Sequence, residues 1–145
     1  LNRFVTAQNL YNLLDKSVEK EVIPACERYG LGVLPYFPLA RGLLTGKYTR
    51  GNEPPKGSRL ASWGDRADSV LTDNNFDVLE KLSSFAKEKD HTLLELAMSW
   101  LVSLPHISSV IAGVTSPKQV QQNVEAASWR LSDEEIKEVN TISSS

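Results

Sequence analysis

The chain has 145 residues, of which 41% are hydrophobic, and this is ordinary for one globular domain with a sizeable core. Its net charge of −2 gives no bulk electrostatic argument for a nucleic-acid partner or an anionic membrane surface. One cysteine, Cys26, excludes an internal disulfide and suits the reducing cytoplasm, and no apolar run approaches the roughly 20 residues of a membrane span.

The chain begins with a strand candidate, residues 4–8, and continues into a helix within residues 17–29. Pro24 is tolerated only in a first turn, so this helix should begin near residues 20–21. Gly30 supplies its end. No signal peptide is visible, and because the chain starts with Leu1 just before a strand, we expect an excised piece or an incomplete chain.

A second strand, residues 32–36, is apolar and is expected to be buried. Pro35 and Pro38 break it into a loop that carries an aromatic pair, an Arg, two Gly and a Lys. Residues 49–72 combine glycine, proline and scattered charge with little periodicity and predict a long surface loop. A loop of that length inside a compact domain is usually functional or mobile.

Four helices are predicted after this loop, with a third strand, residues 110–113, between the second and the third of them: 73–90, 92–103, 116–127 and 132–143. Three of these helices open with a capping box, in which a Ser or Thr precedes a Glu or Gln by three residues: Thr92 with Glu95, Ser116 with Gln119, and Ser132 with Glu135.

Strands that alternate with helices predict an α/β fold with a parallel sheet. Three strands cannot close a barrel, which needs eight strands and typically about 250 residues. The chain is therefore either a small open α/β domain or the terminal part of a (β/α)8 barrel. The long loop after the second strand and the capped helix after the third favour the barrel, whose last two strands commonly build a phosphate site.

Two groups of residues could bind an anion. The helix start at 116–119 offers free N–H groups and the charge of Lys118, although a well-capped helix with a solvated lysine is the favoured alternative. Arg41 and Lys47, with glycines at 42 and 46, form the second group, for which a turn with solvated cations is equally acceptable.

The aromatic pair Tyr36 and Phe37 could stack on a flat ring, although core packing is commoner for such a pair. No catalytic group accompanies these residues. His91 and His106 lie between elements without metal-ligand spacing or a nucleophile beside them, and residues 42–48 are not a P-loop. The sequence therefore predicts a binding apparatus without an acid, a base or a metal.

Three motifs in the same order resemble those of the aldo-keto reductase superfamily. Residues 36–48, YFPLARGLLTGKY, resemble its segment Y-S-P-L-A-x-G-x-L-T-G-K-Y. Residues 8–14, QNLYNLL, resemble Q-x-x-Y-N-L-L, and residues 111–124 resemble I-P-G-x-x-x-P-x-Q-x-x-x-N. The likeness runs from about residue 4 to 142 and is greatest to the bacterial and potassium-channel β-subunit branch.

This resemblance implies that residues 1–145 are the C-terminal part of a (β/α)8 TIM barrel, strands six to eight with the following helices. The catalytic Asp, Tyr, Lys and His of the family would lie in the absent N-terminal half, so no catalytic residue is expected here. The family would place Gln8 on the nicotinamide carboxamide and Tyr36 on its ring. The other cofactor residues implied are Phe37, Pro38, Leu39, Arg41 and Lys47 at the pyrophosphate, Arg59 toward the adenosine phosphate, and Gly113, Thr115, Gln119, Gln122 and Asn123 around the adenosine. Residues 49–72 would cover the cofactor.

Three residues depart from the family pattern. Phe37 stands where the family usually has Ser, so a hydroxyl contact to phosphate is lost. Gln119 stands where some branches carry Arg, which weakens the argument for NADP(H) over NAD(H), although Arg59 and Lys118 could compensate. Ala112 replaces a proline, a change expected to matter little because Gly113 is kept.

By the resemblance, the complete protein would reduce an aldehyde or ketone by hydride transfer from NADP(H), with a tyrosine as the proton donor. Two alternatives stay open: a non-catalytic nucleotide-sensing subunit, and a half-barrel that self-associates to cover its open edges. The expected partners are the nicotinamide cofactor, a small carbonyl substrate, the N-terminal half of the barrel and a second copy of the chain.

Overall fold

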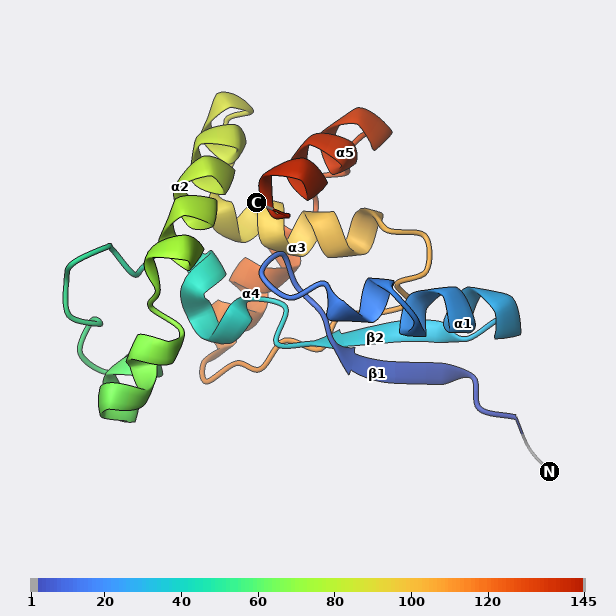
Figure 1. Ribbon diagram of the computed structural model, residues 1–145, viewed down its shortest axis with the longest axis horizontal. Coiled ribbons are helices and arrows are strands. Elements are labelled where there is room, and N and C mark those ends of the chain that lie inside the picture. The colour runs from blue at the N-terminus through green and yellow to red at the C-terminus, as the bar shows by residue number, and fades with distance from the viewer. Residues whose placement is uncertain (1–2, 145) are drawn as a thin grey trace.

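The computed structural model describes residues 3–144 and contains two parallel strands, β1 (Thr6–Leu10) and β2 (Gly32–Tyr36). Their register pairs Gln8 with Leu34 and Leu10 with Tyr36. The first strand begins two residues later than predicted and leaves Phe4 and Val5 exposed before it. Figure 1 shows the two strands side by side, with α1 lying along them.

A third segment pairs with the other edge of β2 but forms no continuous strand, so the predicted strand 110–113 is wrong. Ile107 pairs with Val33 and Ile111 with Tyr36, both in parallel. The N–H of Ile111 donates to the carbonyl of Pro35 at 2.8 Å. Three residues lie between the two paired positions in this segment and two lie between those in β2, so an extra residue interrupts the ladder in the manner of a bulge.

The connection from β1 to β2 contains a 3-10 turn η1 (Ser17–Glu19) and helix α1 (Val22–Tyr29). The predicted start of this helix near residues 20–21 is confirmed, since Glu21 is its N-cap and Pro24 lies in its first turn. Gly30 ends the helix in the left-handed conformation, with φ 65°, as glycine allows.

The four later helices are confirmed, with small differences at their ends: α2 (Asp73–Glu88), α3 (Leu93–Ser103), α4 (Pro117–Ala126) and α5 (Asp133–Ile142). The capping boxes of α3 and α5 form as predicted. The box of α4 forms only in part. Ser116 accepts from the N–H of Gln119, but the Gln119 side chain bonds to Thr115 instead of to Ser116.

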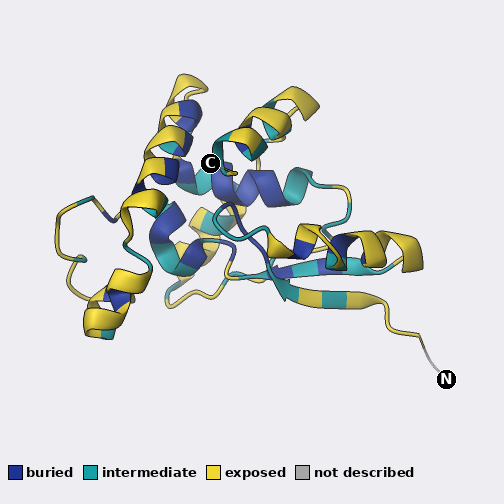
Figure 2. Ribbon diagram, viewed as in Figure 1, coloured by how far each residue is buried: buried dark blue, intermediate teal, exposed yellow. Residues whose placement is uncertain are grey.

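Helix α3 is the centre of the core (Figure 2). Trp100 on this helix is fully buried, its ring meets Tyr11 edge-on at 5.1 Å, and its Nε1 donates to Asn140 Oδ1 on α5. The core therefore joins the segment after β1 to the C-terminal helix. Within residues 3–144, no helix combines the length and apolar character needed to cross a bilayer.

Candidate functional site

The segment after β2 has an unusual backbone. It passes into a 3-10 element η2 (Ala40–Thr45), and Phe37, Ala40 and Arg41 all have positive φ angles, of 53°, 45° and 59°. Side chains other than glycine adopt this region rarely, and such strain tends to occur at functional sites. The turn lies at the carboxyl end of β2, which is where parallel α/β folds place their ligands.

Two arginines contact the ring of Phe37. The guanidinium carbons of Arg41 and Arg59 lie 5.4 Å and 5.6 Å from the ring centroid, and Arg41 also lies 5.7 Å from the ring of Trp63. These are distances at which a cation is attracted to an aromatic face. The 49–72 loop, which supplies Arg59 and Trp63, therefore meets the turn after β2 through alternating guanidinium groups and rings.

Lys47 turns back over the same segment. Its Nζ lies 5.2 Å from the ring of Tyr48, and a Cβ atom added to Gly42 would lie 3.3 Å from Lys47 Cε and Nζ. Gly42 has φ 102°, so the position favours glycine on both counts. The space that the missing side chain leaves is filled by the lysine, which brings a third cation to the turn.

The 49–72 loop is more ordered than its composition predicts. It contains a kinked 3-10 element η3 (Leu60–Ser69), in which Leu60 and Ala67 are buried. Tyr48 is also buried, and its hydroxyl lies 3.4 Å from the N–H of Leu60. The loop is thus anchored to the core in its middle as well as at its ends.

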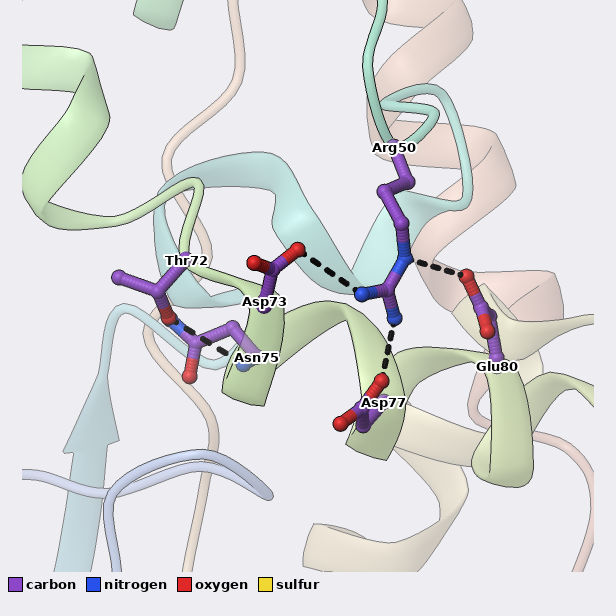
Figure 3. Close-up of polar contacts among 6 residues, drawn as sticks. All are labelled: Arg50, Thr72, Asp73, Asn75, Asp77 and Glu80. Atoms are coloured by element: carbon purple, nitrogen blue, oxygen red, sulfur yellow. Dashed lines mark hydrogen bonds and ion pairs between the residues drawn. The ribbon is translucent and has the colours of Figure 1, made fainter.

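Arg50 joins the two ends of this loop. Its guanidinium forms ion pairs with Asp73 at 2.9 Å, Asp77 at 2.5 Å and Glu80 at 3.1 Å. Figure 3 shows the three carboxylates on successive turns of α2, all directed at Arg50. Hydrogen bonds to Asp77 and Glu80 raise the pKa of Arg50 above its usual range. The start of the loop is therefore held against the helix that follows its end.

A cavity of about 130 Å³ lies beside Phe37 and Arg41, between the ends of β1 and β2 and the end of the 49–72 loop. Asn12, Ser69 and Asn75 also line it. Asn12 is buried, and its Nδ2 donates to the carbonyl of Phe37 at 3.0 Å. Sequence reasoning did not single out Asn12 as a positioning residue, although a polar residue inside the apolar QNLYNLL motif was the available signal.

The other residues implied at the nicotinamide and the pyrophosphate differ in how far they are buried. Tyr36 is partly buried and meets Phe37 edge-on, with ring centroids 5.3 Å apart, and Gln8 is exposed on β1. Pro38 is buried and Leu39 packs against the core, so only part of either reaches the surface of the turn.

The residues implied at the adenosine end form a separate group that follows the third segment. Gln119 Oε1 accepts hydrogen bonds from Thr115, at 2.8 Å from its N and 3.2 Å from its Oγ1. Gly113 and Gln122 are exposed, and Asn123 is partly buried on α4. The pairing of Ile111 with Tyr36 connects this group to the turn after β2.

Comparison with known proteins agrees with this architecture. The aldo/keto reductase family profile matches residues 2–144. A probable voltage-gated potassium channel subunit beta from Oryza sativa subsp. japonica is 38% identical over 84% of this chain and 38% of its own length. The NADH-specific methylglyoxal reductase of Escherichia coli K12 is 33% identical over 87% of this chain and 38% of its own length.

The solved structure of a glycerol dehydrogenase from Gluconobacter oxydans superimposes with a TM-score of 0.77 at 28% identity, over 94% of this chain and 41% of that one. This chain thus spans about two fifths of the length of the relatives it matches. Its α/β fold, a small parallel sheet with the following helices, is part of a (β/α)8 barrel, as the sequence motifs predicted. The chain belongs to the aldo/keto reductase family.

Proposed function

We propose that this chain supplies the cofactor-binding part of an NADP(H)-dependent oxidoreductase that reduces aldehydes or ketones to alcohols. One observation carries the proposal. Arg41 and Arg59 converge on Phe37 at the carboxyl end of β2, and neither guanidinium group forms an ion pair or hydrogen bond with another described residue. Two unpaired guanidinium groups at this position are the chemistry that a phosphate-bearing ligand requires.

The residues present fit a nicotinamide dinucleotide. Arg41, Lys47 and Arg59 would neutralise its phosphates, and Gln8 has an exposed amide for the carboxamide group. The ring of Tyr36 would lie against the nicotinamide and keep water from that face. The cofactor, when bound, supplies the hydride. Gly113, Thr115, Gln119, Gln122 and Asn123 would surround the adenosine, and the 49–72 loop would cover the cofactor.

The preference for NADP(H) is the finer part of the proposal. Arg59 is exposed and unpaired within the described residues, which suits a phosphate on the adenosine ribose. The relative from Escherichia coli is named as NADH-specific, so family membership alone does not decide the cofactor. Cys26 is buried and unpaired, which supports a reducing, cytoplasmic environment.

The test is titration of NADPH and NADH fluorescence against the full-length protein. We expect saturable binding of NADPH, weakened in Arg59→Gln and unchanged in Lys56→Gln, an exposed cation of the same loop. Methylglyoxal and glyceraldehyde 3-phosphate, which the names of two relatives suggest, are the first carbonyl substrates to assay. Absence of binding of either nucleotide would overturn the proposal.

A second candidate is a nucleotide-sensing subunit without turnover, because a relative at 38% identity is named a potassium channel subunit beta. The discriminating result is NADPH binding without oxidation by any aldehyde, in a protein whose N-terminal half lacks the Asp, Tyr, Lys and His set. Self-association of the isolated chain is a further possibility to test, because Phe4, Val5 and Val124 are exposed. A monomeric mass in size-exclusion chromatography would argue against it.

A further inference from the structure

The ring of Phe37 is an unusual element of this site because it contacts two cations and no anion. Phe37 is 38% exposed and borders the cavity, and its backbone carbonyl accepts a hydrogen bond from the buried Asn12. A backbone with positive φ at Phe37 and again at Arg41 sets the directions of the two side chains. Asn12 therefore holds the backbone of Phe37, while the ring meets Tyr36 edge-on and lies within reach of both guanidinium groups.

The charge around this ring is unbalanced. The guanidinium carbons of Arg41 and Arg59 can be no farther apart than 11.0 Å, the sum of their distances to the ring centroid. This upper limit exceeds the Debye length of about 8 Å at physiological ionic strength, so the mutual repulsion is screened at that distance, but neither guanidinium is neutralised by an ion pair with a described carboxylate. Arg50, in contrast, is paired with three carboxylates only a few residues away in the chain. A ligand with negative charge would neutralise these two cations, because Asp15 lines the same cavity but forms no ion pair with either arginine.

We infer that Phe37 is a positioning residue that holds Arg41 and Arg59 as a two-guanidinium clamp for a phosphate group, an inference that rests on the proposed function. A hydroxyl at this position would donate one neutral hydrogen bond to a phosphate. The ring donates none, but it holds two charged donors before the ligand arrives, so less side-chain entropy is lost on binding. The phosphate contact in this chain is therefore ionic, and cofactor affinity should fall steeply with salt.

The test measures the Kd of the full-length protein for NADPH and NADH over a range of NaCl concentrations. Phe37→Leu keeps an apolar side chain but removes the ring, and we expect binding about three- to tenfold weaker at low salt, with a flatter salt dependence. Phe37→Tyr keeps the ring and is the matched control, which should bind like the wild type. A thermal melt of each variant excludes a general loss of folding.

A double-mutant cycle separates positioning from direct contact. If Phe37 acts through the arginines, Phe37→Leu should have little further effect in Arg41→Gln/Arg59→Gln. Equal losses for both nucleotides would place the clamp on the shared diphosphate, and a loss confined to NADPH would place it on the 2′-phosphate. Additive effects, or a Phe37→Leu variant with wild-type affinity and salt dependence, would overturn the inference. The proposed function fails separately, if the wild type binds neither nucleotide.

Discussion

The contact between Gly32 and Ser108 gives a direct test of how β2 holds the third segment. A Cβ atom added to Gly32 would lie 2.0 Å from Ser108 Oγ and 2.9 Å from Ser108 Cβ. Rotation of the serine side chain can move its Oγ but not its Cβ. Ordinary contact between such atoms begins at 3.4 Å, so the segment at Ser108 must move away by about half an ångström.

Gly32→Ala should therefore lower the free energy of unfolding. Overpacking of this kind costs about 1–3 kcal/mol, and replacing glycine by alanine in a strand returns about 0.5–1 kcal/mol. These figures leave a net loss of about 0–2.5 kcal/mol, and because the added Cβ would lie only 2.9 Å from Ser108 Cβ we expect a value in the upper part of that range. It should appear as a lower midpoint of urea denaturation with an unchanged slope.

Ser108→Gly removes the obstructing Cβ atom and completes a double-mutant cycle. In the Ser108→Gly protein, Gly32→Ala should lower the free energy of unfolding much less than it does in the wild type. Because this segment leads to the Gly113–Gln119 group, NADPH affinity should fall in Gly32→Ala. It should recover in the variant that also carries Ser108→Gly. A Gly32→Ala protein as stable as the wild type, or strictly additive effects, would refute the reasoning.

Three further predictions concern the cap of α3, the partly buried His106 and the start of the 49–72 loop. Thr92→Ala removes the side chain that accepts from Glu95 N at 3.2 Å and should lower the free energy of unfolding by about 1 kcal/mol in urea, whereas Thr92→Ser should keep most of it. Burial lowers the pKa of His106 below 6.5, so its neutral form stabilises the fold above pH 6.5 and this stability is lost as the pH falls from 6.5 through the folded-state pKa. As the pH falls over this range, the Tm of His106→Asn should fall less than that of the wild type. Parallel plots of Tm against pH for the two proteins would show that His106 does not cause the loss of stability. Arg50→Gln should speed chymotryptic cleavage at Trp63 with little change in the urea midpoint, because it frees the loop without touching the core. High salt should speed cleavage of the wild type in the same way. Unchanged cleavage would show that Arg50 does not restrain the loop.

Local chemistry made most of the helices predictable. The Thr92 and Ser132 boxes form because each cap and its partner lie three residues apart, so the sequence contains the whole interaction. Gly30 ends α1 for a similarly local reason. The box at Ser116 forms only in part, because the Gln119 side chain bonds to Thr115, one residue before the cap, instead of to Ser116.

The sequence by itself determined the helix positions, the alternation of strands and helices and, through its motifs, the family. Only the tertiary structure decided that the third strand is reduced to two pairs, because this depends on matching the spacing of Ile107 and Ile111 to that of β2. It alone showed that Arg59 reaches Phe37 from a loop 22 positions later. Both results rest on contacts between segments distant in the chain, whose geometry is set by packing and not by the neighbours of each residue.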